Sequence, residues 1–156
     1  MQNTITKEIA SHPSVKRMDS RISWKNRWDH ITARVGANRA GYRVEPGLYA
    51  IGAPDSGSPV LVTANYTLSF DALRSSVKGI SAYILVLDTF GVNVWCAAAK
   101  GAFSANELIS RIESVSLKDV VSHRCLILPQ LSGPGVAAGL VKKKSGFRVE
   151  FGPVRA

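Results

Sequence analysis

The feature that most constrains the fold is the nearly uninterrupted apolar run AYILVLD at Ala82–Asp88. A strand this apolar has no polar face to turn toward water, so both of its faces must be covered. Segments with helical periodicity lie before and after it, at Thr67–Val77 and Ser104–Val115. Strands that alternate with helices indicate an α/β fold, a Rossmann-like, mostly parallel sheet flanked by helices.

The same alternation continues from Gly47 to the end of the chain. Ser104, followed by Glu107 three residues later, is the signature of a capping box at a helix start. The predicted strands are Leu48–Ile51, Pro59–Thr63, Ala82–Asp88, Cys125–Leu128 and Phe147–Phe151, and the third predicted helix is Gly135–Lys144.

The first 41 residues differ from the rest. Residues 1 to about 20 are polar and without sustained periodicity, which indicates a loose leader or a short helix. From Ile22 to about Val35, apolar residues recur at spacings of four, three and four, as on one face of an amphipathic helix. Such a face packs on the sheet or lies on a membrane surface, and we expect packing on the sheet. The sequence predicts a leader and helix over 1–41 and an α/β domain over 42–156.

Composition excludes several classes of protein. Twenty basic and eleven acidic residues give a net charge of +9, but outside Lys142–Lys144 the charges are scattered, without the aromatic-interleaved stripe of a nucleic-acid binder. No apolar stretch approaches the roughly 18 residues of a membrane-spanning helix. The two cysteines form neither a disulfide framework nor a zinc signature. We expect a soluble, cytoplasmic protein.

Ligands of parallel α/β sheets bind beyond the carboxyl ends of the strands, here Thr63–Ser69, Asp88–Phe103 and Pro129–Gly135. In the second segment, Asn93 is a good N-cap, which places Cys96 in the first turn of a short helix, where backbone N–H groups and the helix dipole favour a thiolate. From the residues alone, Cys96 is either an inert buried cysteine or a functional one. If it were a nucleophile, His123 would be its only plausible histidine partner.

The segment Asn93–Gly101 reads N-V-W-C-A-A-A-K-G and resembles the cap-helix motif of the mercury-methylating corrinoid proteins, the HgcA family. That family belongs to the CO dehydrogenase/acetyl-CoA synthase corrinoid protein superfamily. The corrinoid iron–sulfur proteins of acetyl-CoA synthesis share the fold, but their pattern places no cysteine at this position. The resemblance covers about residues 42–156, with further matching segments at 46–52, 59–66, 69–74, 84–89, 120–124, 126–131, 134–138 and 146–149.

The resemblance implies a cobalamin whose own tail base is displaced and whose cobalt is ligated by Cys96. Thr63 and Ser69 would lie on the opposite, methyl-bearing side. The implied activity is corrinoid-dependent methyl transfer, to Hg(II) as the substrate. The implied partners are a ferredoxin-like electron donor with two [4Fe–4S] clusters and a corrinoid methyl donor protein. The implied cofactor-binding residues are Thr63, Asn65, Ser69, Asn93, Val94, Trp95, Cys96, Ala97, Ala99, Lys100, Gln130, Pro134 and Gly135.

Two departures from the family pattern bear on this interpretation. Ala99 replaces a glycine three residues after Cys96, and its methyl group could hinder the close approach of a corrin ring. The membrane-embedded region of the family does not occur within the 156 residues, so membrane attachment is expected only through a region outside this chain.

Two alternatives stay open. One is a corrinoid-binding methyl carrier of the acetyl-CoA pathway type, with an acceptor other than mercury. The other is a dinucleotide-binding protein, because Gly133–Gly139 reads G-x-G-x-x-x-G after a strand and Glu150 closes the next strand. Among residues outside the motif, Cys125 is expected in the core and Asp88 is expected to cap the turn that follows its strand.

Overall fold

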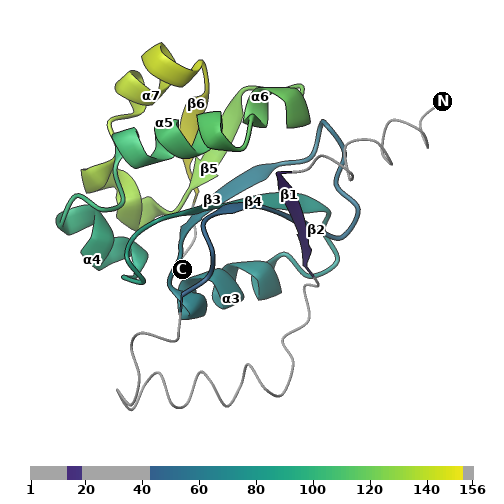
Figure 1. Ribbon diagram of the computed structural model, residues 1–156, viewed down its shortest axis with the longest axis horizontal. Coiled ribbons are helices and arrows are strands. Elements are labelled where there is room, and N and C mark those ends of the chain that lie inside the picture. The colour runs from purple at the N-terminus through teal and green to yellow at the C-terminus, as the bar shows by residue number, and fades with distance from the viewer. Residues whose placement is uncertain (1–13, 19–42, 153–156) are drawn as a thin grey trace.

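The computed structural model describes residues 14–18 and 43–152, and it contains a six-stranded sheet with the order β1-β2-β4-β3-β5-β6. Four of the five strand pairings are parallel, and β2 with β4 is antiparallel. The predicted α/β fold with a mostly parallel sheet is therefore confirmed (Figure 1). The strands are β1 (Val15–Met18), β2 (Gly47–Ile51), β3 (Val60–Ala64), β4 (Ala82–Leu87), β5 (Cys125–Leu128) and β6 (Arg148–Phe151).

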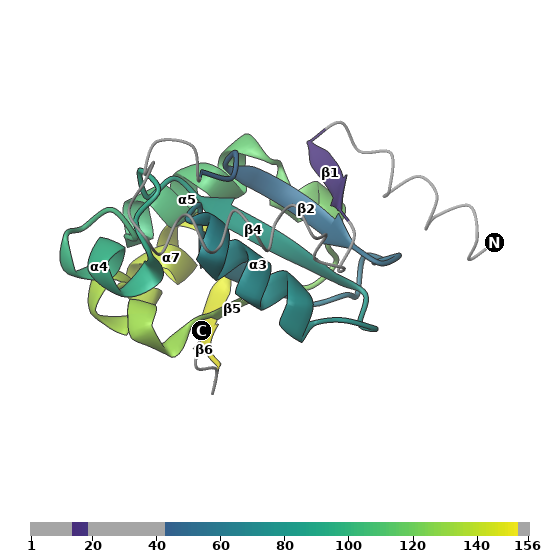
Figure 2. The same cartoon turned by 90° about the horizontal axis from the view of Figure 1, so that it is seen from below.

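Helices cover both faces of the sheet, as the apolar run at Ala82–Asp88 requires. All six residues of β4 are buried. One face packs against α3, and the other packs against α5 and its neighbours, so two separate apolar cores form (Figures 1 and 2). The helices are α3 (Thr67–Ser76), α4 (Val94–Ala99), α5 (Ala105–Ser114), α6 (Leu117–Val120) and α7 (Ala138–Ser145), with the 3₁₀ helix η2 (Gln130–Gly135).

Two predicted elements are wrong. Val15–Met18 is a strand paired in parallel with β2, rather than part of a loose leader or a helix. The helix predicted from Gly135 begins only at Ala138, because Gln130–Gly135 forms η2 first. The amphipathic helix predicted over Ile22–Val35 lies outside the described residues, and the domain boundary at residue 42 stays a prediction.

The predicted cap of α5 forms, but Glu107 has a different partner. Ser104 Oγ accepts a hydrogen bond from Glu107 N at 3.3 Å. The Glu107 carboxylate accepts from the backbone N–H of Asp88 at 2.9 Å and pairs with Arg111 at 2.8 Å. Glu107 thus ties α5 to the end of β4.

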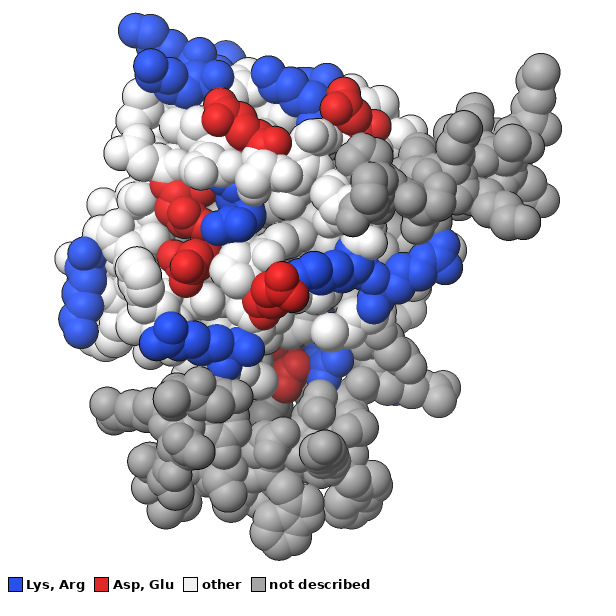
Figure 3. Space-filling view, viewed as in Figure 1, with Lys and Arg blue, Asp and Glu red and all other residues white. Residues whose placement is uncertain are grey.

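No helix within the described part of the chain is both long and apolar enough to span a membrane. Basic and acidic side chains are interspersed over the face shown in Figure 3. Charge on that face is mixed in sign, so it does not distinguish one region as a site.

Candidate functional site

The chain reverses its direction of travel across the sheet between β3 and β5. It passes from β3 to β4 on one side, and then returns through α4, α5 and α6 to β5 on the other side. Such a switch point separates two crossover connections, which leaves a crevice at the carboxyl ends of the two strands. Thr63 and Asn65 mark the end of β3, and Pro129 follows β5.

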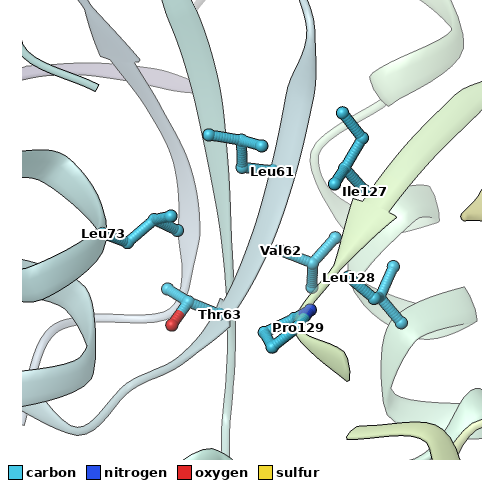
Figure 4. A pocket seen from close by; sticks show the side chains of 7 residues that line it. All are labelled: Leu61, Val62, Thr63, Leu73, Ile127, Leu128 and Pro129. Atoms are coloured by element: carbon cyan, nitrogen blue, oxygen red, sulfur yellow. The ribbon is translucent and has the colours of Figure 1, made fainter. Parts of the chain in front are cut away.

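A small hollow of about 20 Å³ lies at this switch point, with room for about one water molecule. Thr63, only 1 % exposed, lies on the α3 side of β3, and Val62 points to the opposite side toward Leu128 (Figure 4). Because the hollow is small and mostly apolar, any sizeable ligand must lie over the edge of the sheet. The residues that line the hollow are Leu61, Val62, Thr63, Leu73, Ile127, Leu128 and Pro129.

Cys96 lies in the first turn of α4, as its sequence predicts. The Asn93 side chain accepts a hydrogen bond from Cys96 N at 2.9 Å, which caps the helix. Val94 and Ala97 are buried in the core, whereas Trp95 is 65 % exposed and Cys96 is half-buried. The helix therefore presents Cys96 and Trp95 outward while its apolar side anchors it.

The 3₁₀ helix η2 packs against α4, and Gly135 makes this packing possible. A Cβ built on Gly135 would lie 2.2 Å from the carbonyl oxygen of Phe103 and 3.0 Å from Cα of Ala98. The glycine is required for contact with the protein's own backbone. The Gly133–Gly139 segment does not form the strand–turn–helix of a dinucleotide-binding fingerprint, since η2 separates β5 from α7. That geometry contradicts the dinucleotide-binding alternative.

Asn65 connects the end of β3 to the turn that leads into α4. Its side-chain oxygen accepts from the backbone N–H groups of Thr89 and Gly91, at 3.0 and 2.9 Å. Its amide nitrogen donates to the Asp88 carboxylate at 3.1 Å, and that carboxylate accepts from Phe90 N at 3.0 Å. Asp88 therefore caps its turn as predicted. The family resemblance implies Asn65 as a cofactor-binding residue, and the sequence gives no sign of these contacts, because the partners lie 23 to 26 residues away.

Large apolar side chains are exposed where the carboxyl ends of the parallel strands meet, which we call the carboxyl edge of the sheet. Phe90 follows β4 and is 65 % exposed, with a backbone φ of +56°, a left-handed conformation that costs a bulky residue about 1–2 kcal/mol. Trp95 in α4, Leu131 in η2 and Phe151 at the end of β6 are exposed as well. An apolar edge that stays exposed, with one strained aromatic residue, indicates a binding surface.

The remaining predicted residues lie at or near this edge. Ser69, in the first turn of α3, is half-buried, and Ala99, Lys100, Gln130 and Pro134 are exposed. Their roles as ligand contacts stay predictions.

The other thiol and histidine are placed elsewhere. His123 precedes β5 at the opposite side of the sheet, where the parallel strands begin, which we call the amino edge. There its Nε2 lies 2.8 Å from the Ser58 carbonyl oxygen, and its Nδ1 accepts a hydrogen bond from Cys125 N at 3.3 Å. The sheet separates it from Cys96, so a Cys96–His123 nucleophile pair is excluded. Cys125 is half-buried and lies 3.9 Å from Arg148 Nη2, so it is not the core residue that the sequence predicted.

Comparisons with known proteins agree on one family. A sequence model of the CO dehydrogenase/acetyl-CoA synthase delta subunit family matches residues 36–156. The acetyl-CoA decarbonylase/synthase complex subunit gamma of Methanopyrus kandleri is 39 % identical over 112 residues, 70 % of this chain and 24 % of the relative. The corresponding subunit of Archaeoglobus fulgidus is 34 % identical over 118 residues, 74 % of this chain and 25 % of the relative.

A relative with a different description also matches. The corrinoid/iron-sulfur protein large subunit of Moorella thermoacetica is 33 % identical over 116 residues, 73 % of this chain and 26 % of the relative. The chain thus spans about a quarter of the length of these relatives.

Proposed function

The chain belongs to the CO dehydrogenase/acetyl-CoA synthase delta subunit family, and from this membership we propose that it is a corrinoid-binding methyl carrier of the acetyl-CoA pathway type. The observation that carries the proposal is the exposed apolar edge that also presents Cys96. A corrin ring is a large ligand with extensive apolar surface, and such ligands need an apolar seat with few polar groups. The amino edge offers no comparable surface among the described residues, since Ile80 is its one exposed large apolar side chain.

The donor set fits a corrinoid. A corrin ring carries its own cobalt, so the protein would need to add few ligands, and a thiolate is suitably soft for that metal. Cys96, half-buried on a capped helix, would supply that thiolate. Over residues 14–18 and 43–152, no three His, Cys, Asp or Glu side chains could hold a metal ion by themselves. When bound, the group supplies a cobalt centre that can hold a methyl group and release it.

Different residues of this chain would contact different parts of the corrinoid. Asn93 fixes Cys96 by capping α4, and Trp95 extends apolar surface beside it. Ser69, half-buried at the start of α3, would contact the side away from Cys96, and Thr63, buried at the end of β3, would lie behind that contact. Lys100 and Gln130 are exposed and free to approach the amide groups at the ring's periphery. Ala99 is exposed at the end of α4, so its methyl group would lie on the surface that receives the ring.

The two cysteines allow a matched experiment, because both are half-buried and reduced. The protein is reconstituted with cobinamide, which lacks the tail base, and with methylcobalamin, and the absorption spectrum and affinity are measured. Cys96→Ala should change the cobalt spectrum and Cys125→Ala should leave it unchanged. Identical spectra for the parent and both variants would overturn ligation by Cys96, and failure of the parent to bind either corrinoid would overturn the proposed function.

A second candidate function is corrinoid-dependent methyl transfer to Hg(II), favoured by the N-V-W-C-A segment with its capped cysteine. The matched relatives are acetyl-CoA decarbonylase/synthase complex subunits and a corrinoid/iron-sulfur protein large subunit, so they support the carrier function better than mercury methylation. Here Hg(II) would be the substrate that receives the methyl group, and Cys96 would be the residue that holds the corrinoid through its thiolate.

The mercury candidate has its own test. Methyl-loaded protein is mixed with Hg(II), and methylmercury is measured with and without a reductant and a methyl donor. We expect at most one methyl group per cofactor from the protein alone. Renewal would need a low-potential partner, proposed as a ferredoxin-like protein with two [4Fe–4S] clusters, and a methyl donor protein. Transfer at the parent rate by Cys96→Ala would contradict this candidate.

A further inference from the structure

We propose that Asn65 is a positioning residue, which with Asp88 sets the place of α4 and therefore of Cys96. The inference rests on the proposed function, since the position of Cys96 matters only if Cys96 meets a ligand. Asn65 follows β3 at the switch point and is 2 % exposed, so it has little surface to offer a ligand. Its polar atoms are instead engaged by the turn after β4.

The orientation of the Asn65 amide is fixed by its partners. The oxygen receives two backbone N–H groups, from Thr89 and Gly91, and the nitrogen donates to a carboxylate. The reversed amide would place its NH₂ against two donors and its oxygen against the Asp88 carboxylate. The Asn65 amide therefore binds both donors and an acceptor of the turn, and only one orientation of the amide satisfies all of them.

The hydrogen bonds continue from the turn to the start of α4. The Thr89 hydroxyl lies 2.9 Å from Asn65 Oδ1 and 2.7 Å from the Val92 carbonyl oxygen. The hydroxyl has one proton to donate, and Asn65 Oδ1 already accepts from two N–H groups. We therefore infer that the Thr89 hydroxyl donates its proton to the Val92 carbonyl oxygen. Val92 N in turn donates to the Thr89 carbonyl at 3.0 Å, and the next residue is Asn93, which caps α4.

The same contacts hold a strained residue. Phe90 lies between Thr89 and Gly91, and the Asn65 side-chain oxygen accepts hydrogen bonds from the N–H groups of both neighbours. The N–H group of Phe90 itself donates to the Asp88 carboxylate. Its left-handed backbone is unfavourable for a phenylalanine. Loss of the Asn65–Asp88 contact should therefore let the turn relax and α4 shift, while the sheet stays intact.

A reciprocal exchange of side chains tests this contact. Asn65→Asp keeps the size and the acceptor oxygen but places a second carboxylate beside Asp88. The double variant Asn65→Asp with Asp88→Asn restores one amide donor and one carboxylate acceptor across the 3.1 Å contact, but not the bond from Phe90 N, because Asp88 Oδ1 accepts both bonds in the parent. Ser145→Ala is the matched control, because Ser145 is a buried, hydrogen-bonded side chain on α7, away from the turn.

Two readouts separate this proposal from the proposed function. Hydrogen exchange of residues 88–100 in ligand-free protein should accelerate at least about tenfold in Asn65→Asp, as expected for loss of a buried hydrogen bond, and return toward the parent rate in the double variant. Ser145→Ala should leave that segment unchanged. Unchanged exchange in Asn65→Asp, or no recovery in the double variant, would overturn the positioning role.

The second readout is the Cys96-dependent cobalt spectrum after addition of cobinamide. Asn65→Asp should lose that spectrum or need at least about tenfold more cobinamide to reach it, and the double variant should regain it. A parent-like spectrum at parent affinity in Asn65→Asp would overturn the proposal. Absence of the spectrum in the parent would overturn the proposed function alone, since the exchange measurement needs no ligand.

Discussion

The two edges of the sheet use polar side chains in the same way but end with different surfaces. At the amino edge, the turn before β3 is fixed to the start of β5: Ser122 N donates to the Ser56 carbonyl at 2.8 Å, and His123 Nε2 lies 2.8 Å from the Ser58 carbonyl. Asp55 accepts from Ser58 Oγ, a bond that lowers the pKa of Asp55. These groups satisfy one another and leave a polar surface.

At the carboxyl edge, Asn65, Asp88 and Asn93 also satisfy backbone groups of the turns. The side chains that these turns then present are Phe90, Trp95 and Cys96, which are apolar or thiol. An exposed apolar surface that is held in place by hydrogen-bonded turns is typical of a surface that binds a ligand or a partner. We therefore propose that the amino edge serves stability and the carboxyl edge serves binding.

The largest expected effect is at Gly135, where η2 meets α4. Gly135→Ala forces a methyl group against the backbone of Phe103 and Ala98, and should lower the free energy of unfolding by about 3 kcal/mol. Gly139→Ala is the control, since nothing lies within 4 Å of its added Cβ, and in α7 it should raise stability by about 0.5–1 kcal/mol. Urea unfolding measures both. Equal small changes would show that η2 and α4 are not tightly packed.

The second prediction contrasts the edges directly. His123→Ala removes two hydrogen bonds at the amino edge and should cost about 1–2 kcal/mol of stability while the cobinamide affinity stays within about twofold. Asn93→Ala removes the cap of α4 and should cost about 1 kcal/mol, with a loss of affinity as well. The division between edges fails if His123→Ala weakens binding as much as Asn93→Ala does.

The smallest effect on folding is expected for Trp95, which is 65 % exposed. Trp95→Ala should change the free energy of unfolding by no more than about 0.5 kcal/mol, because surface substitutions usually do. Cobinamide affinity should fall about tenfold if the ring covers the indole. Ile80→Ala, at the amino edge and 54 % exposed, should change neither quantity. Parallel behaviour of the two variants would argue against a special role for the carboxyl edge.

Much of the fold could be predicted because it depends on local patterns. The apolar run of β4 requires covered faces, and the caps Asn93 and Ser104 act within three residues. Other features had no local signal. The four residues of β1, VKRM, alternate too little to indicate a strand, and only pairing with β2 makes them one. Gly133, Pro134 and Gly135 favour a turn of several kinds, and packing on α4 selects η2.

The site could be predicted in part for the same reason. Cys96 and its cap lie in one short segment that the sequence marks clearly. The contacts of Asn65 could not be predicted, since its partners Asp88, Thr89 and Gly91 meet it only when β3 and β4 pair. The sequence likewise does not predict that Phe90 and Leu131 stay exposed, since large apolar residues are usually buried.

The most direct test of the central claim, that the carboxyl edge binds a corrinoid, is hydrogen–deuterium exchange with and without methylcobalamin. The account predicts slower exchange in residues 63–69, 88–100 and 130–136 when methylcobalamin is present, and no change in residues 52–58 and 118–124. Protection confined to those two amino-edge segments, or no protection in 88–100 at saturating methylcobalamin, would contradict it.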